Sequence, residues 1–502
     1  MKNKQNITSS KSALAHNKQV IGYITQYDAW KDIQDIVPKA GYTHVNVDFS
    51  QYTILNFSFF GVARDGSLHS GDFRNKQIYD PGQVQEPAPM LYEDPYSSFD
   101  LWILYGELDT VWYIGTDHWA YQLGYRNNPG SCEGSDGWLN VNSQLRGCYP
   151  LVLPKPGGEP GLLQKGKDEG VKVMASIGGW SMCKHFPEMA KDNTKKNRFL
   201  DDCEKLISMG FDGIDIDWEY PNGRGMNIID YGEVDYNNFA QLMDDIRERI
   251  GSDKLLTAAF SAVPELLSGF DWARLNNSMD YFNMMTYDFN GGFSDIAGHN
   301  SPLYDYPGQE ASNRSLDACI LALRNFGVNM SKVTAGIATY GRGVITQGQA
   351  ALNSPLVKRN ETVDPDGPIE TGSDFDHWPE TQGTPYYSMV LHRATVVNGW
   401  TEHWDDNAKV PYRTKDKYFI SYDDERSVGE KAAYIIDQEL AGCIVWQVFG
   451  DMLNMSSQIV PIVPDKLVHC PNTRTPLVNK INEVFTSGKE AAMAPLTSSA
   501  NG

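Results

Sequence analysis

The chain has 502 residues, of which 41% are hydrophobic and 12% aromatic, so it is long and apolar enough to bury a large core. Its formal net charge of -21 at pH 7 argues against nucleic-acid binding, because this field repels phosphates and no block of Lys or Arg offsets it. No apolar run reaches the roughly 20 residues that a membrane-spanning helix needs, so we expect no membrane insertion.

Short apolar segments rich in β-branched and aromatic residues recur along the chain and predict eight strands. They cover residues 19–24, 52–62, 171–180, 211–219, 254–262, 280–288, 332–341 and 442–450. Amphipathic stretches between them, such as 238–250 and 316–327, predict helices. Repeated strand–helix units imply parallel pairing, and eight such units close into an α/β fold of the (β/α)8 TIM-barrel type. A doubly wound open sheet is the alternative for the same pattern.

Two gaps between the predicted strands are too long to be simple connections. Within a predicted barrel over 19–485, we expect long insertions at 63–170, after the second strand, and at 344–440, after the seventh. Both are rich in aromatic residues, which could form small cores of their own or line a cleft. Residues 1–18 are expected to be a flexible N-terminal segment, and the small, polar tail over 486–502 is expected to be disordered.

The seven cysteines predict neither a disulfide framework nor a zinc site, because their number is odd, they are scattered and none forms a C-x-x-C pair. Cys132 and Cys148 flank a polar, Gly-rich loop, and the spacing leaves open whether they are bridged. Cys319 and Cys443 lie in apolar segments and are predicted to be free core thiols.

The stretch FDGIDIDWEY, residues 211–220, places four acids among residues typical of a buried strand. Side chains alternate along a strand, so Asp215, Asp217 and Glu219 share one face, while the Ile and Trp residues between them share the other. Successive acids on that face stand about 6 to 7 Å apart, and their repulsion raises at least one pKa. This arrangement is suited to handling protons. Glu219 comes last, at the carboxyl end of the strand where barrel active sites lie, and is the best candidate for a catalytic acid.

Two other interpretations of this stretch are weaker. A solvent-facing strand coated with acids would have to bury Trp218 on its opposite face although the neighbouring strands are apolar on both faces. A calcium-binding loop needs a glycine for its sharp turn where this chain has Tyr220, and the intervening residues are strand formers.

Four motifs along the chain carry a resemblance to a known family. DGIDIDWE (212–219) is the full D-x-x-D-x-D-x-E signature of glycoside hydrolase family 18. SIGG (176–179) is similar to the S-x-G-G motif of the family's third strand, and MTYD (285–288) to the M-x-Y-D motif of its sixth. Trp446 stands where the family places a tryptophan on its last strand. The chain therefore resembles a family 18 chitinase of the bacterial type, with 19–485 as its catalytic barrel. The segment 344–440 resembles the small α+β insertion that some members carry at this place.

The resemblance implies a chitinase that hydrolyses β-1,4 bonds between N-acetylglucosamine units by retaining, substrate-assisted catalysis through an oxazolinium intermediate. Glu219 would protonate the glycosidic oxygen. Asp217 would orient the 2-acetamido group and share a proton with Asp215, and Tyr287 would donate a hydrogen bond to that group. No cofactor and no metal are implied.

The resemblance also implies a set of substrate-binding and structural residues. Tyr23 and Ser176 would hydrogen-bond the inner aspartates, and the other substrate-binding residues would be Trp180, Met285, Asp288, Tyr340, Arg342 and Trp446. Asp212, Gly178 and Gly179 would be structural. The chain departs from several bacterial relatives at Phe293, where they have a tryptophan, which leaves the strength of stacking on the leaving-group side open.

Alternatives to a chitinase are a lectin-like protein that binds chitin oligosaccharides without cleaving them and an endo-β-N-acetylglucosaminidase. Lectin-like members usually lack the terminal glutamate, whereas Glu219 is present. The expected partners are chitin or its oligosaccharides. We expect a secreted or exported protein, although the first residues lack the apolar segment of a Sec-type signal peptide. Some relatives with large insertions after the second strand are subunits of secreted bacterial toxin complexes, so a larger secreted assembly is a further hypothesis.

Overall fold

The computed structural model describes most of the chain. The described residues are 14–33, 36–72, 84–92, 94–223, 225–226, 228, 230–357, 383–456 and 458–493. Residues 1–13 of the predicted N-terminal segment, 494–502 of the predicted tail and parts of both predicted insertions lie outside them. Among the helices of these described stretches, none has both the length and the apolar character needed to cross a membrane.

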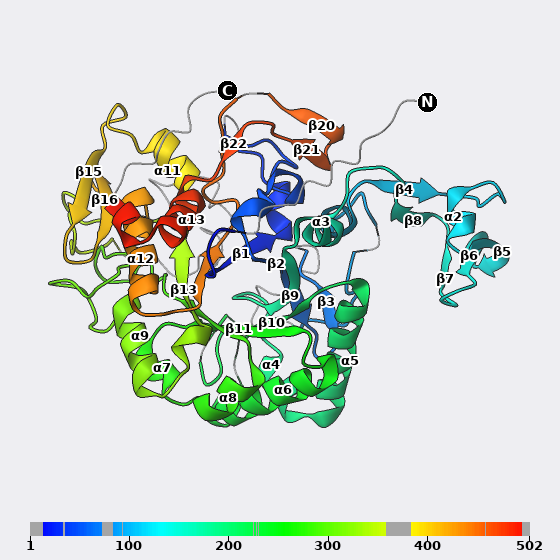
Figure 1. Cartoon of the computed structure of the whole chain (residues 1–502), viewed down its shortest axis with the longest axis horizontal. Helices are drawn as coiled ribbons and strands as arrows, with labels where there is room; N and C mark the ends of the chain where they lie inside the picture. The colour runs from blue at the N-terminus through cyan, green and yellow to red at the C-terminus, as the bar shows by residue number, and fades with distance from the viewer. Residues whose placement is uncertain are drawn as a thin grey trace.

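Eight parallel strands form a closed barrel at the centre of the molecule (Figure 1). They are β1 (Gln19–Thr25), β2 (Ile54–Val62), β9 (Lys172–Gly178), β10 (Gly213–Asp217), β11 (Leu255–Ser261), β12 (Tyr281–Met285), β13 (Val333–Ala338) and β18 (Gly442–Trp446). Each pairs with the next in this order, and β18 pairs with β1 to close the ring. The predicted TIM barrel is confirmed, and closure rules out the open sheet.

Helices cover the outside of this barrel, most visibly along its lower rim in Figure 1. They include α3 (Leu162–Glu169), α4 (Phe186–Lys191), α5 (Asn193–Met209), α6 (Val234–Ile250), α7 (Pro264–Leu267), α8 (Trp272–Ser278), α9 (Leu316–Asn325), α12 (Glu425–Asp437) and α13 (Pro476–Ser487). Helix α5 shows why such segments start and stop where they do. The Asp192 side chain caps its first N–H groups, and Gly210 ends it with a left-handed φ of 114°.

The strand β10 faces two environments, as the alternation of its side chains predicts. Ile214 and Ile216 are fully buried in the core, and the Trp218 ring stacks on Phe186 of α4 with centroids 5.3 Å apart. The strand ends at Asp217, two residues before the predicted end at 219. Trp218 and Glu219 therefore lie beyond the last strand pairing, which joins Asp217 to Gly178.

The segment after β2 extends away from the barrel, and we call residues 106–160 the projecting arm (Figure 1). It is preceded by β3 (Leu68–Ser70), which pairs antiparallel with β2, and by α1 (Asp100–Tyr105). The arm contains β4 (Leu108–Val111), α2 (Trp119–Gln122), β5 (Tyr125–Cys132), β6 (Ser135–Asn140), β7 (Arg146–Cys148) and β8 (Leu151–Pro154). It has a small apolar core of its own.

The structure answers whether Cys132 and Cys148 are bridged, which their spacing left open. Cys132 and Cys148 form a disulfide within the projecting arm, with Cα atoms 5.7 Å apart. Cys319 and Cys443 are buried free thiols, as predicted.

The segment between β13 and β18 contains a second small unit. It is an antiparallel sheet of β14 (Arg342–Ile345), β17 (Tyr418–Ser421), β16 (Val410–Lys415) and β15 (Thr401–Asp405), with α11 (Tyr387–Arg393). The range 344–440 also contains α12, which contacts β18, and the range 63–170 contains α3, which contacts β9. Both predicted insertions thus include a helix that packs on the barrel.

The described parts of both chain ends contact the barrel's last helix. His16 Nε2 lies 2.9 Å from Asn482 Oδ1, and its ring packs edge-on against Phe485. At the other end, η6 (Lys489–Met493) buries Ala492, and Lys480 Nζ donates to the Ala491 carbonyl at 2.6 Å. The predicted flexibility of residues 1–18 and disorder of residues 486–502 stay predictions.

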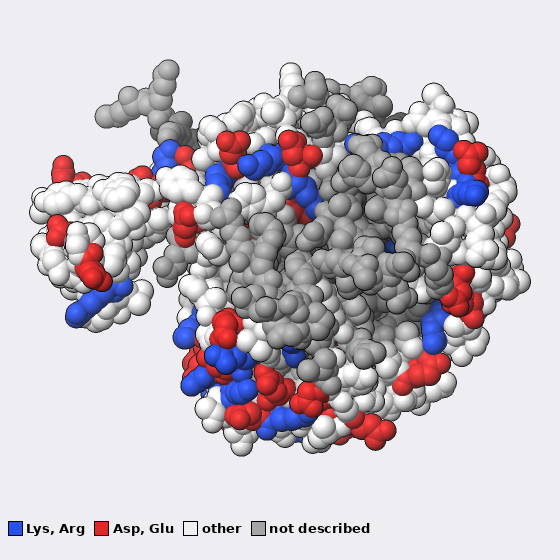
Figure 2. All heavy atoms as spheres, turned by 180° about the vertical axis from the view of Figure 1, so that it is seen from behind, with Lys and Arg blue, Asp and Glu red and all other residues white. Residues whose placement is uncertain are grey.

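Charges on the face shown in Figure 2 are mixed, with Lys and Arg side chains beside Asp and Glu, and the projecting arm carries few of either. Ion pairs join neighbouring helices, for example Lys196 of α5 with Asp245 of α6 at 2.7 Å. The described part of this face carries no basic patch of the kind that binds a phosphate backbone.

Candidate active site

Asp215 lies fully buried inside the barrel and is held by side chains from different strands. Its Oδ2 accepts hydrogen bonds from the Tyr23 hydroxyl at 3.0 Å and Ser176 Oγ at 2.6 Å, as the family resemblance implied. Its Oδ1 accepts from Thr257 Oγ1 at 2.6 Å and from Asn283 Nδ2 at 3.3 Å. These hydrogen bonds fix both carboxyl oxygens of Asp215 in place.

Asp217, two residues further along the same face, is only 3% exposed. Burial raises its pKa well above the usual range, and so do the charge of Asp215, the hydrogen bond between the two carboxyl groups and the charge of Glu219. Asp217 therefore keeps its proton at pH values where an ordinary aspartate has lost it, as the repulsion between stacked acids predicts.

Glu219 lies past the end of β10 and is buried, but at 8% exposure it is more accessible than Asp215 and Asp217. Its backbone N–H donates to Cys183 Sγ at 3.2 Å. The next residue, Tyr220, is close enough that burial, the charges of Glu219 and Asp288 and a hydrogen bond with Glu219 all raise the pKa of its hydroxyl. Glu219 is therefore the outermost of the three carboxylates, as expected for an acid that reaches a bound substrate.

The glycines after Ser176 are required by close approach of the backbone to β10. Gly178 and Gly179 have φ values of 112° and 79°. A Cβ at residue 178 would stand 2.2 Å from the Asp217 carbonyl oxygen, and one at residue 179 would stand 2.7 Å from the Phe59 ring. Because neither residue has a side chain, the backbone comes close enough for the Gly179 N–H to donate to the Asp217 carbonyl at 2.9 Å. Larger residues in this motif would prevent that approach. Trp180 follows the two glycines and is partly buried.

The end of β12 brings Tyr287 to the acids. Its side chain is 8% exposed, and burial together with the charges of Asp288, Asp217, Glu219 and Asp215 raises the pKa of its hydroxyl. The phenol therefore keeps its proton and remains a hydrogen-bond donor. Met285, the last residue of β12, is partly buried against the core.

Asp288 is held by Tyr340 and Arg342, two of the expected substrate-binding residues, which lie past the end of β13. Its Oδ1 accepts from the Tyr340 hydroxyl and from Arg342 Nε at 3.0 Å, and Arg342 Nη2 lies 2.8 Å away. The guanidinium group of Arg342 also lies 5.7 Å from the centre of the Phe293 ring, which is 62% exposed. Phe293, at the position where the sequence departs from relatives, is thus available at the surface for a ligand.

Trp446 is the last residue of β18 and packs beside Tyr23, one of the residues that hold Asp215. Its partly buried ring stacks on Phe59 with centroids 5.6 Å apart and meets the Tyr23 ring edge-on at 5.5 Å. Because Tyr23 also hydrogen-bonds Asp215, only its side chain separates the indole ring from this buried carboxyl group.

Asp212 lies at the opposite end of β10. Its Oδ2 accepts from the Val173 N–H at 3.0 Å and its Oδ1 lies 3.2 Å from Lys172 Nζ. These contacts join β10 to β9 far from the outer carboxylate, in agreement with the structural role expected for Asp212.

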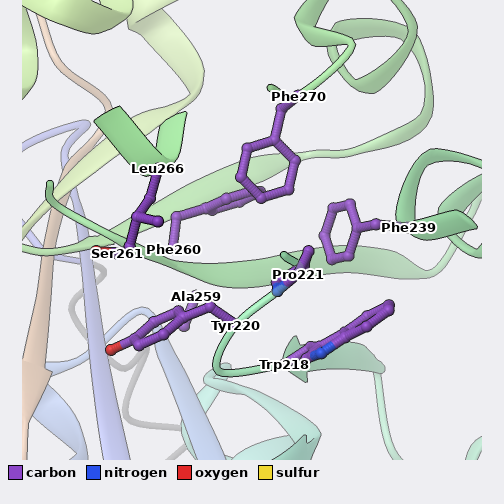
Figure 3. A pocket seen from close by; sticks show the side chains of 9 residues that line it. All are labelled: Trp218, Tyr220, Pro221, Phe239, Ala259, Phe260, Ser261, Leu266 and Phe270. Atoms are coloured by element: carbon purple, nitrogen blue, oxygen red, sulfur yellow. The ribbon is translucent and has the colours of Figure 1, made fainter. Parts of the chain in front are cut away.

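A small apolar pocket lies behind the segment that carries the outer acid (Figure 3). Rings of Trp218, Phe239 and Phe270 gather around it, while the hydroxyl end of Tyr220 points away from them. No carboxylate lines this pocket, so it is separate from the acids. Its lining includes residues of the segment 218–221, which the aromatic rings pack beside.

Comparison with known proteins agrees with the geometry of the carboxylates. Residues 138–451 match the family model of glycosyl hydrolases family 18. The chain belongs to this family. The match covers more than half of the chain and includes the strands β9 to β18 that carry the acids, the glycines and Trp446.

Family 18 relatives among curated proteins include chitinase A1 of Niallia circulans and chitotriosidase-1 of Mus musculus. The first is 32% identical over 300 residues, 56% of this chain and 41% of the relative. The second is 29% identical over 300 residues, 56% of this chain and 59% of the relative. The chain thus spans about half the length of the curated relatives it matches.

Solved structures with the same fold include chitinases of a bacterium and an insect. A chitinase from Bacillus thuringiensis aligns with a TM-score of 0.64 at 22% identity, over 94% of this chain and 70% of that one. The Group IV chitinase of Ostrinia furnacalis, solved with allosamidin, aligns with a TM-score of 0.63 at 21% identity, over 94% and 99%. At these identities the likeness concerns the family 18 barrel fold.

Four residues of this family 18 site were missed from sequence: Cys183, Tyr220, Thr257 and Asn283. Two of them carry a signal in hindsight. Thr257 is a polar residue inside the apolar strand LLTAAFS, and Asn283 shares a strand face with Met285 and Tyr287 because strand side chains alternate. Cys183 carries none, since its contacts with β10 join residues more than 30 positions apart.

Proposed function

We propose that this family 18 protein is a chitinase, which hydrolyses β-1,4 bonds between N-acetylglucosamine units by retaining, substrate-assisted catalysis. One observation carries the proposal: Glu219 is the most exposed of three acids on one face, backed by the buried Asp217, whose pKa is raised by burial and by Asp215. The relatives and aligned structures named above are chitinases or a chitotriosidase, which supports the same substrate class.

Glu219 supplies the proton in the first step. Protonation of the glycosidic oxygen makes the departing sugar a neutral alcohol, and the same carboxylate then accepts a proton from the water that completes hydrolysis. Tyr220, which hydrogen-bonds Glu219, steadies the carboxyl group between these two states.

Asp217 and Tyr287 orient the substrate's own nucleophile. A retaining glycosidase normally uses a second carboxylate as nucleophile, and family 18 is an exception because the substrate's acetamido oxygen attacks the anomeric carbon. Asp217, tied to Asp215, accepts a hydrogen bond from the acetamido N–H and stabilises the positive oxazolinium ion. The Tyr287 phenol, which keeps its proton, donates to the same group.

The surrounding residues suit a neutral sugar chain. The formal charge of -21 would repel an anionic polymer, whereas chitin carries no charge. The partly buried Trp446 offers a flat apolar surface under a sugar ring, and Asp288, fixed by Tyr340 and Arg342, presents its remaining carboxylate oxygen to sugar hydroxyls.

We extend the proposal to a secreted or exported protein. The Cys132–Cys148 disulfide of the projecting arm supports this, because disulfides persist in oxidising compartments and are rare in the cytosol.

Cleavage is expected to require a 2-acetamido group on the sugar whose glycosidic bond breaks. Without that group there is no internal nucleophile, so fully deacetylated chitosan and cello-oligosaccharides should be inert while N-acetylglucosamine oligomers are cut. The first product should be the β-anomer, because the anomeric carbon is inverted twice. NMR of the initial products reports the anomer directly. An initial α-anomer, or brisk cleavage of the deacetylated polymer, would rule out the substrate-assisted mechanism.

Trp446→Ala is expected to weaken oligosaccharide binding and turnover more than it lowers stability. Truncating a fully buried tryptophan costs about 3 to 5 kcal/mol, and the partly buried indole should cost less. Thermal melts with and without an N-acetylglucosamine oligomer, together with KM, separate the two effects. Trp272→Ala is the matched control: that ring is 4% exposed and packs on Phe260 and Phe282, so its loss should cost the full amount and leave KM unchanged. The same pattern in both variants would make Trp446 a core residue.

A further inference from the structure

Cys183 contacts the backbone on both sides of Trp218. It lies in the loop between β9 and α4 and is fully buried. Its thiol is 2.9 Å from the Asp217 carbonyl oxygen and 3.0 Å from that of Gly179, and its sulfur accepts the Glu219 N–H at 3.2 Å.

These contacts lie where the barrel stops supporting the backbone. Pairing between β10 and β9 ends at Asp217 and Gly178, and β10 pairs with β11 only as far as Ile216. The Glu219 N–H therefore has no partner in the strand ladder, and a buried N–H needs an acceptor. The sulfur of Cys183 provides it.

We propose that Cys183 is a positioning residue, which fixes the backbone of Glu219 so that its carboxyl group stands over Asp217 in one orientation. The thiol donates to a carbonyl at the end of the strand, and its sulfur accepts from the N–H of Glu219. The Cys183 side chain therefore takes the place of the strand pairing that ends two residues earlier, at Asp217. The effect on turnover rests on the proposed chitinase activity, whereas the contact itself does not.

The remaining contacts of the loop restrain it in the same place. The Gly179 N–H donates to the Asp217 carbonyl, and the Phe186 ring at the start of α4 stacks on Trp218. Burial, together with the charge of Glu219, raises the pKa of the Cys183 thiol well above its usual range, so the side chain remains a neutral donor. A serine keeps one donor and one acceptor at this position, and an alanine keeps neither.

The test compares Cys183→Ala with Cys183→Ser in the full chain. The alanine variant should lose about 10- to 100-fold in kcat with KM little changed, because a small displacement of a catalytic group is costly while the binding surface is intact. The serine variant should stay within about threefold of wild type, since it keeps the hydrogen bonds. Cys203→Ala is the matched control, a fully buried free thiol of α5, and should leave kcat unchanged. Cys183→Val, which keeps the side-chain bulk, takes the place of alanine if the latter does not fold.

Hydrogen exchange gives a second measurement that needs no turnover. In a peptide containing Glu219, mass spectrometry should find its amide exchanging about tenfold faster or more in Cys183→Ala than in wild type, with the serine and Cys203→Ala variants unchanged. If the wild-type protein does not cleave chitin oligomers, the proposed function is overturned. Amide exchange at Glu219 then decides by itself whether Cys183 positions this backbone. Unchanged kcat in active Cys183→Ala protein, or unchanged exchange at Glu219, would overturn the inference.

Discussion

Glu219→Gln should abolish turnover of N-acetylglucosamine oligomers and leave their binding intact. The amide keeps the size and shape of the side chain and has no transferable proton, and loss of a general acid costs roughly 10² to 10⁴ in rate. Because Glu219 is the outermost acid and is 8% exposed, its replacement should not disturb the buried Asp215 network. Initial rates and calorimetric titration with an oligomer measure the two effects separately.

The control for this variant is Glu265→Gln, which makes the same chemical change on α7. The Glu265 side chain is 63% exposed and pairs with Arg314, so its loss should change neither rate nor binding. Retention by Glu219→Gln of more than about a tenth of the wild-type rate would place the general acid elsewhere, since that loss falls below the range for a general acid.

Asp217→Asn should lower kcat by about 10²-fold, in the range seen when one electrostatic contact to a developing charge is lost. It should also change the pH profile. The raised pKa of Asp217 means that this carboxyl group keeps its proton at pH values where an ordinary aspartate has lost it, and releases it only as the pH rises further. The asparagine does not ionise, so this step should vanish from the dependence of kcat on pH, leaving the ionisation of the remaining carboxyl groups.

Asp212→Asn is the matched control on the same strand. The asparagine oxygen still accepts the Val173 N–H, and only the ion pair with the exposed Lys172 is lost. Its kcat and pH profile should follow wild type. An unchanged profile and rate in Asp217→Asn would make Asp217 a strand residue without a part in the reaction.

The barrel could be predicted because its signal is local and repeated. Each barrel strand is an apolar segment of a few residues whose alternation sets one face inward, and the alternation at 214–218 placed acids inside and Ile and Trp against the helices. The contacts of the chain ends could not be predicted this way. Residues 14–18 and 486–493 look polar, yet His16 contacts Asn482 and Ala492 is buried.

The site was predicted where its residues form short motifs and missed where they do not. Asp215, Asp217 and Glu219 follow from one strand, and Tyr287 and Asp288 from the end of another. Tyr340 and Arg342 were expected only as substrate-binding residues, and the structure shows that they hold the Asp288 carboxylate. Neither the bridge between Cys132 and Cys148 nor the use of Cys183 could be derived from spacing.

The fold class, the family and the acids that share a face follow from the amino-acid sequence, because they depend on periodicity and on residues adjacent in the chain. The contacts that hold the acids come from the folded arrangement of the strands. Asp215 takes its hydrogen bonds from Tyr23, Ser176, Thr257 and Asn283, up to 192 residues away, and Glu219 takes its backbone acceptor from Cys183 in another loop. The physical reason is that closing the barrel brings strand ends distant in sequence within hydrogen-bond range, where donor and acceptor must match in direction as well as type.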